Sequence, residues 1–138
     1  MQIKVYKYLH DDATLIRREV FIEEQGFKDE FDDIDEIAMH LVAYDGDEPA
    51  GTCRLFYDIG RSSYVLGRLA VRKPYRGANL GSWLIQEAEA QAITNGGQSM
   101  ILHSQCVATG FYRKNGYREY GDVEDEEGCP HIWMKKKL

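Results

Sequence analysis

The spacing of hydrophobic residues along the chain changes between two periods, one typical of strands and one typical of helices. Ile3 and Val5 alternate with polar residues, which indicates a strand, whereas Ile16 and Val20 lie four positions apart, as on one helix face. The predicted elements are, in order, a strand within 1–9, a helix over 11–26, strands over 38–44, 49–57 and 64–72, a helix over 80–95, a strand over 99–103, a short helix near 106–115, and strands near 117–121 and 131–136.

Turn residues separate these elements. The sequence Asp-Gly-Asp at 45–47 predicts a hairpin between two of the strands. Gly67 marks a bulge or a close backbone approach inside another strand, and the glycine pair at 96–97 ends the long helix. The element order β-α-β-β-β-α-β-α-β-β is typical of an α/β fold: a single strongly twisted mixed sheet of about seven strands, flanked by helices. We expect residues 1–138 to form one domain.

Composition narrows the class of protein. The 138 residues are 43% hydrophobic and 29% charged, and no stretch reaches the roughly 18 apolar residues of a membrane span. The first residues are expected to form a strand rather than a signal peptide. The three cysteines include no CxxC pair and the four histidines lie far apart, so neither a disulfide framework nor a metal site is expected. We therefore expect a cytoplasmic protein without a membrane partner.

The net charge of −6 is concentrated in two stretches. Residues 23–36 hold eight acids against Lys28 alone, and a second acidic group lies at 122–127. Such a surface repels nucleic acid, whose binding depends on lysine and arginine at the phosphates. It would attract a cation, although a solvated acidic loop gives the same pattern.

Glycines and cationic side chains lie together between a predicted strand and the long helix. In the segment RLAVRKPYRGANLGSWL, Pro74 stops strand pairing and the helix begins near Asn79 or Leu80. A helix start presents unpaired N–H groups and partial positive charge, and glycine lets that backbone approach an anion. The turn either binds an anion such as a pyrophosphate or only packs helix against strand. The phosphate-loop pattern GxxxxGK[ST] and the dinucleotide pattern GxGxxG are absent.

This segment resembles the acetyl-CoA-binding motif [Q/R]-x-x-G-x-[G/A] of the GNAT superfamily of N-acetyltransferases. Arg76 matches the first position and Gly81 the last, while Asn79 stands where the family usually has glycine. Asparagine tolerates left-handed backbone, so this departure is mild. The segment 108–117 is similar to the family's aromatic-rich helix, and the resemblance extends over the chain, towards a mostly uncharacterised bacterial subgroup.

The resemblance implies acetyl-CoA as cosubstrate and assigns residues to it. The backbone of Leu69, Ala70 and Val71 would hold the pantetheine arm, and Tyr112 would protonate the departing thiolate. A phenol with a pKa of ~10 is able to protonate a thiolate with a pKa of ~8.5. The residues expected around the pyrophosphate are Arg76, Gly77, Ala78, Asn79, Leu80, Gly81 and Ser82.

The acceptor side is less determined by the sequence. The amine needs a proton acceptor, and His103 at the end of a central strand is our first candidate. Glu24, His40 and His131 are further candidates for the base or for substrate binding, and Arg54 for an anionic part of the substrate.

The expected activity is transfer of acetyl to a small amine in a ternary complex. A non-enzymatic acyl-CoA-binding or sensing domain is the alternative, and an acyltransferase like the autoinducer synthases is a third. A covalent acyl-enzyme at Cys106 is conceivable. By analogy, the expected oligomeric state is a homodimer.

Overall fold

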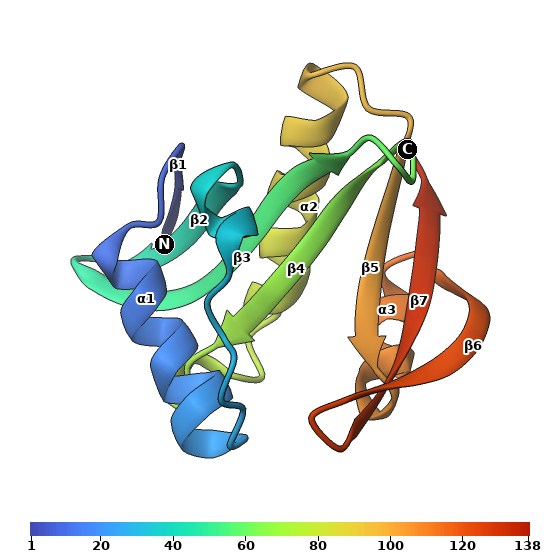
Figure 1. Ribbon diagram of the computed structural model, residues 1–138. Helices are drawn as coiled ribbons and strands as arrows, with labels where there is room; N and C mark the ends of the chain where they lie inside the picture. The colour runs from blue at the N-terminus through green and yellow to red at the C-terminus, as the bar shows by residue number, and fades with distance from the viewer.

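A twisted seven-stranded sheet with the order β1-β2-β3-β4-β5-β7-β6 runs through the computed structural model, which describes residues 1–138 (Figure 1). The predicted fold class is confirmed. The strands are β1 (Gln2–Tyr6), β2 (Met39–Asp45), β3 (Glu48–Asp58), β4 (Ser63–Val71), β5 (Ser99–Gln105), β6 (Arg118–Glu126) and β7 (Cys129–Lys137). The α-helices are α1 (Asp11–Arg17), α2 (Leu80–Thr94) and α3 (Thr109–Lys114). None of the helices combines the length and the hydropathy that a membrane crossing requires.

Strands β4 and β5 are parallel but pair only over Tyr64–Leu66 and Met100–Leu102. Beyond this short ladder they diverge, as Figure 1 shows below the point where both begin. Strand β4 continues to pair with β3 as far as Val71, while β5 pairs with β7 along its whole length. From Gly67 onward, the edge of β4 that faces β5 therefore has no strand partner.

A bulge lies in β4 where this divergence begins. The register against β3 shifts between Thr52 and Arg54, and Arg68 opposite has a left-handed φ of 51°. The predicted irregularity at Gly67 is thus found at the adjacent residue. Non-glycine residues in this conformation cost on the order of 1–3 kcal/mol and persist where their surroundings hold them. Here the Arg68 side chain is held by ion pairs with Glu30 and Asp32.

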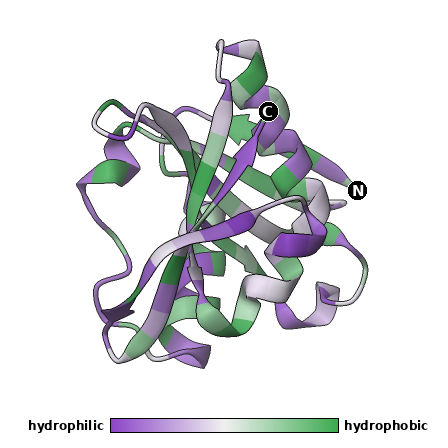
Figure 2. Cartoon of the chain, turned by 90° about the vertical axis from the view of Figure 1, so that its right-hand side faces the viewer, coloured by the Kyte–Doolittle hydropathy of each residue, from purple (hydrophilic) through white to green (hydrophobic).

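Helices cover both faces of the sheet. Leu84, Ile85 and Ala88 of α2 pack on one face, and Ala13 and Ile16 of α1 pack on the other. Hydrophobic residues concentrate in the inner strands and helices, while the loops and the C-terminal end of β7 are hydrophilic (Figure 2). The hydrophobic core thus lies on both faces of the sheet.

Two predicted elements differ from the structure. The helix expected over 11–26 is α-helical only to Arg17 and continues as a π-helix over Arg18–Glu24, closed by the hydrogen bond from Gln25 N to Val20 O at 3.2 Å. The acidic stretch after it is solvated only in part: six of its eight acids are exposed, whereas Glu30 and Asp35 are 4% and 5% exposed. Short 3₁₀ helices lie at Asp33–Glu36, Lys73–Tyr75 and Cys106–Ala108.

Candidate active site

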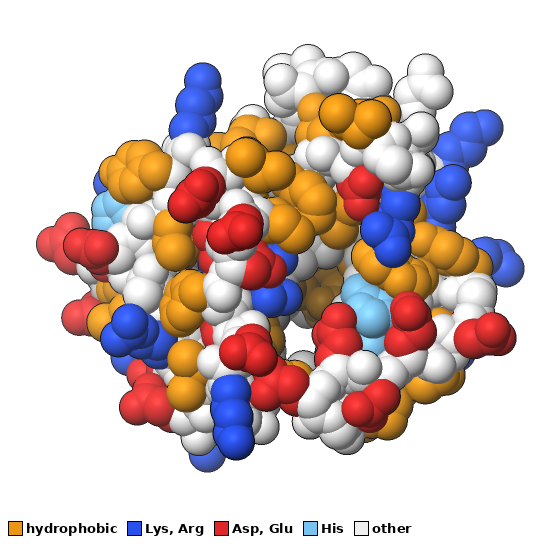
Figure 3. Space-filling model, in the orientation of Figure 1, with side chains coloured by type: hydrophobic (Ala, Val, Ile, Leu, Met, Phe, Trp, Pro, Cys, Tyr) orange, Lys and Arg blue, Asp and Glu red, His pale blue; other side chains and the backbone are white.

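A cavity of about 700 Å³ lies where β4 and β5 separate. One wall comes from β3, β4 and the segment 25–34, and the other comes from β5, β7 and the β6–β7 hairpin. Figure 3 shows the hollow between the two halves of the molecule, with a histidine flanked by acidic residues on one side. The lining includes five predicted site residues: Arg54, Leu69, His103, Tyr112 and His131.

A second cavity, of about 560 Å³, lies beside α1. It is lined by residues such as Tyr8, Thr14 and Phe31 and by none of the predicted site residues. The cavity between β4 and β5 is therefore the candidate active site.

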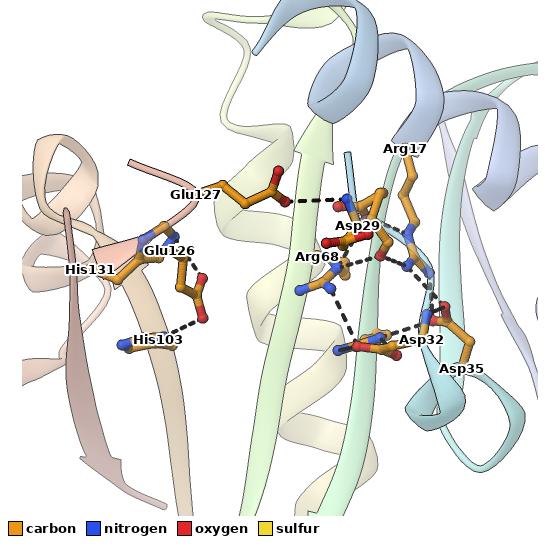
Figure 4. A network of polar contacts seen from close by, with 11 residues as sticks. Arg17, Asp29, Asp32, Asp35, Arg68, His103, Glu126, Glu127 and His131 are labelled. Atoms are coloured by element: carbon orange, nitrogen blue, oxygen red, sulfur yellow. Dashed lines mark hydrogen bonds and ion pairs between the residues drawn. The ribbon is translucent and has the colours of Figure 1, made fainter. Parts of the chain in front are cut away.

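The β3–β4 wall is built on a network of three arginines and three acids. Buried Arg17 donates to Glu30 Oε2 at 2.8 Å and to Asp35 Oδ1 at 2.7 Å. Arg54 donates to Asp32 Oδ1 at 2.7 Å and to Asp35 Oδ1 at 3.0 Å, and Arg68 lies 3.0 Å from Glu30 Oε2. Figure 4 shows this network at the edge of the cavity. The charges of these six side chains cancel, so the network adds no net charge to the site.

Burial raises the pKa values of the acids in this network, and pairing with arginines lowers them. Burial alone would raise the pKa of Asp35, but the hydrogen bonds and charges of Arg17 and Arg54 outweigh it and lower the pKa to about 2. For Glu30 burial prevails over the arginines, and the pKa is raised. Burial also lowers the pKa of His40, whose Nε2 lies 2.9 Å from the carbonyl oxygen of Asp35. His40 and Arg54 thus hold the acidic segment in place.

The opposite wall carries two histidines joined by one carboxylate. His103 Nδ1 lies 3.0 Å from Glu126 Oε1, and His131 Nε2 lies 3.2 Å from Glu126 Oε2. His131 Nδ1 donates to the carbonyl oxygen of Cys129 at 2.8 Å, and the His103 ring stacks on Trp133 with centroids 4.6 Å apart. Figure 4 shows Glu126 between the two rings, on the side that faces the β3–β4 wall.

Two contacts bridge the cavity. The Glu127 carboxylate, at the tip of the β6–β7 hairpin, accepts hydrogen bonds from the backbone N–H groups of Lys28 and Asp29 at 3.0 and 3.2 Å. Gln105 Nε2 donates to Gln25 Oε1 at 2.7 Å. These contacts tie the acidic segment to the C-terminal half of the sheet and partly enclose the space between them.

Tyr112 of α3 reaches the cavity from the far side of β5. The side chain is partly buried, and its hydroxyl group forms no hydrogen bond within the protein. Burial, with a smaller contribution from the Cys53 thiol, raises the pKa of Tyr112. The phenol is therefore protonated at neutral pH and is able to donate.

The glycine-containing turn leads from the free edge of β4 into α2. Gly77 has a φ of 86° and Asn79 a left-handed φ of 61°, and Asn79 immediately precedes the first residue of α2. A Cβ at Gly77 would meet no atom within 4 Å, and one at Gly81 would lie 3.0 Å from the Phe111 ring. The open backbone at the N-terminus of a 15-residue helix suits an anionic group.

Arg76 is oriented away from this backbone. Its guanidinium group binds Glu24 at 2.9 and 3.0 Å and the carbonyl oxygen of Val71 at 2.8 Å. Glu24, a candidate for the acceptor side, is thus placed beside the turn and outside the lining of the cavity. His40 also lies outside that lining.

Sequence reasoning missed Glu126 and Trp133, which lie in the cavity wall beside His103. The sequence did contain a signal: the acidic group at 122–127 is followed closely by His131. In a hairpin, strand alternation places Glu124, Glu126 and His131 on one face of the sheet. The arginine network was also missed, since its partners are up to 38 residues apart.

The sheet thus opens between two parallel strands, and a glycine-containing turn leads from the edge of one of them into a helix. Over residues 10–138 the sequence matches the family described as acetyltransferase (GNAT) domain. The chain therefore belongs to the GNAT family, and it is an acetyltransferase with acetyl-CoA as its cosubstrate.

The sequence is also similar to individual proteins over most of their length. The "Uncharacterized N-acetyltransferase YjcF" of Bacillus subtilis is 35% identical over 128 residues, covering 91% of this chain and 90% of that protein. YyaT of the same organism is 38% identical over 135 residues, covering 94% and 89%. The crystal structure of a candidate N-acetyltransferase from Lactobacillus plantarum has a TM-score of 0.88 and 32% identity, covering 100% of this chain and 99% of that one.

Proposed function

We propose that the protein transfers the acetyl group of acetyl-CoA to the amine of a small molecule, by direct attack within a ternary complex. The observation that carries this proposal is the convergence of the free edge of β4, the Tyr112 hydroxyl and the Glu126–histidine wall on one cavity. A donor along β4 and an acceptor between the two walls would meet there.

In this proposal, acetyl-CoA is bound mainly by backbone groups of β4 and of the turn that follows it. The unpaired edge of β4 at Leu69, Ala70 and Val71 offers N–H and C=O groups to an extended amide-containing arm, as a neighbouring strand would. The backbone of the turn at 76–82 and the start of α2 offer N–H groups to the pyrophosphate. The Arg76–Glu24 ion pair keeps this turn in place rather than contacting the ligand itself.

When bound, acetyl-CoA supplies a reactive thioester. The acceptor nitrogen first loses a proton to one of the side chains of the opposite wall, which are His103, Glu126 and His131. Its lone pair then forms the C–N bond as the C–S bond breaks, and the Tyr112 hydroxyl donates a proton to the sulfur. The buried phenol regains its proton from solvent through the open cavity.

The charges around the cavity favour an acceptor with one positive charge. Glu30 and Asp32 are neutralised by arginines, Asp58 binds Arg61, and Glu127 is occupied by backbone N–H groups. The acidic segment alone would attract a polycation, but four of its eight acids are paired with arginines: Glu24, Glu30, Asp32 and Asp35. We propose a small primary amine, with Arg54 and His131 lining its site, and a cytoplasmic location.

Initial-rate kinetics with a panel of primary amines tests this function. Release of free CoA that depends on both substrates, with intersecting double-reciprocal plots, is the expected result. Parallel plots would indicate an acyl-enzyme, for which Cys106 near the cavity is the candidate nucleophile. Binding of acetyl-CoA without CoA release for any amine would favour a sensing domain.

A further inference from the structure

We propose that the Glu126 carboxylate, rather than His103, accepts the proton of the acceptor amine, and that His103 and His131 hold this carboxylate in position. The proposal rests on the proposed function, since it concerns the same cavity. It replaces the base expected from the sequence with a neighbouring residue from the β6–β7 hairpin.

Accessibility separates the two candidates. His103 Nδ1 is engaged by Glu126, and His103 Nε2 is a buried atom without a hydrogen-bond partner that lies 3.3 Å from Glu124 Oε1. Neither ring nitrogen is therefore open to a ligand. The Glu126 side chain is 50% exposed and lines the cavity. An amine in the cavity would meet this carboxylate first.

The protonation states of the three groups are consistent with this assignment. The Cys129 carbonyl only accepts, so His131 Nδ1 carries a hydrogen. An ionised Glu126 also only accepts, so His103 Nδ1 carries a hydrogen. The 3.2 Å approach of His131 Nε2 to Glu126 Oε2 is favourable when a proton lies on His131 Nε2. Glu126 is then a carboxylate held at both oxygens.

Of the five other acids that line the cavity, Asp29 alone has no partner for its carboxylate, and the other four are less suited to accept a proton. Glu30 and Asp32 are held by arginines, and Glu127 accepts from two backbone N–H groups. Glu126 is paired only with the two histidines, His103 and His131. Its free lone pairs face the cavity, where the amine would lie.

The step balances without a further reactant. One proton moves from the ammonium nitrogen to a Glu126 oxygen, which leaves a neutral amine and a neutral carboxyl group. The nitrogen lone pair forms the new C–N bond to the acetyl group. The proton on Glu126 returns to solvent through the exposed part of the side chain.

Glu126→Gln tests the proposal, because glutamine keeps the shape and both contacts. Its amide oxygen accepts from His103 Nδ1 and its amide nitrogen donates to His131 Nε2 when that atom carries no hydrogen, but the amide accepts no proton at working pH. Asp122→Asn, on the same strand and outside the cavity lining, is the matched control with the same change in charge. CoA release is measured from pH 6 to 10, together with the thermal shift caused by acetyl-CoA.

The pH range is part of the test, because an acceptor amine that is already deprotonated at high pH needs no general base. Besides the two histidines, the charged groups near Glu126 are Glu124, Asp125 and Glu127 on its own hairpin, Asp29 on the facing segment, and Arg61 over the Trp133 ring. These are unchanged in the variant. We expect kcat of Glu126→Gln to fall roughly 10²–10⁴-fold at neutral pH and to recover partly at high pH, where the amine is deprotonated. The acetyl-CoA shift stays as in the unmodified protein.

Three other results would overturn the proposal. If Glu126→Gln keeps kcat within about threefold of the unmodified protein, Glu126 is not the base, and the proposed function stands without it. If both variants lose activity equally, the effect is one of surface charge. If the unmodified protein releases no CoA with any amine although acetyl-CoA binds, the proposed function fails and this proposal fails with it.

Discussion

Replacing Arg17 by methionine removes the centre of the network that forms one wall of the site. Arg17 is 1% exposed. Its guanidinium group donates to the carboxylates of Glu30 and Asp35 and to the backbone oxygen of Glu30. Methionine keeps most of the aliphatic volume, so the main loss is the charge and its hydrogen bonds. The carboxylates of Glu30 and Asp35 remain buried, without the positive charge and the hydrogen bonds of Arg17.

The magnitude follows from this geometry. Removing one partner of a buried ion pair costs about 3–5 kcal/mol, because the remaining charge is left without a partner. For a domain of 138 residues each kcal/mol lowers Tm by about 3 °C, so we expect a decrease of about 10–15 °C. Arg18→Met, at the exposed next position, should cost less than about 1 kcal/mol.

The dependence on pH distinguishes lost charge pairing from lost packing. In the unmodified protein the lowered pKa of Asp35 gives stability that is present above its ordinary value of 3.8 and is lost as pH falls towards 2. In Arg17→Met, burial acts on Glu30 and Asp35 with less opposition, so their pKa values rise and protonation relieves the buried charge. The difference in unfolding free energy between the two proteins should therefore shrink from pH 7 to pH 4.5.

Urea unfolding at both pH values measures this difference. A loss below about 1 kcal/mol, or an equal loss at the two pH values, would refute the reasoning that the network is held by buried charge pairing. A smaller effect of Arg17→Met in the Asp35→Asn background would confirm that the two residues are coupled.

Three further predictions concern the site. Tyr112→Phe should lower kcat by roughly 10²–10⁴ and leave acetyl-CoA affinity nearly unchanged, and an unchanged kcat would remove Tyr112 from the mechanism. Gly81→Glu should abolish the acetyl-CoA-induced thermal shift, since the new side chain meets Phe111 and adds negative charge at the turn; retained binding would place the ligand elsewhere. Glu127→Ala should speed hydrogen exchange at the Lys28 and Asp29 amides about tenfold or more, and unchanged exchange would show that the bridging contact adds no protection.

The sequence was sufficient for the order of elements because each has a local signal. The start of α2 is an example: the turn before it was predicted from its glycines, and the left-handed Asn79 is found at the expected place. The bulge in β4 was likewise predicted within one residue, from a glycine inside an alternating strand. Signals of this kind depend on neighbouring residues only.

The pairing of charged side chains could not be predicted in the same way. Eight acids in one stretch look like a solvated loop, and only the fold brings Arg54 and Arg68 from the sheet onto that stretch. The change from α-helix to π-helix after Arg17 also has no local signal in the sequence, and Val20 and Phe21 of the π-helix are buried in the core. The role of each acid is thus decided by its tertiary partner.

Hydrogen exchange with and without acetyl-CoA tests the placement of the cosubstrate most directly. Bound along the free edge of β4 and at the start of α2, it should slow the exchange of backbone amides in residues 67–71 and 76–82, and leave those of 118–126 in β6 unchanged. Protection confined to the cavity beside α1, or no protection in either β4 or the turn, would contradict the site described for this acetyltransferase.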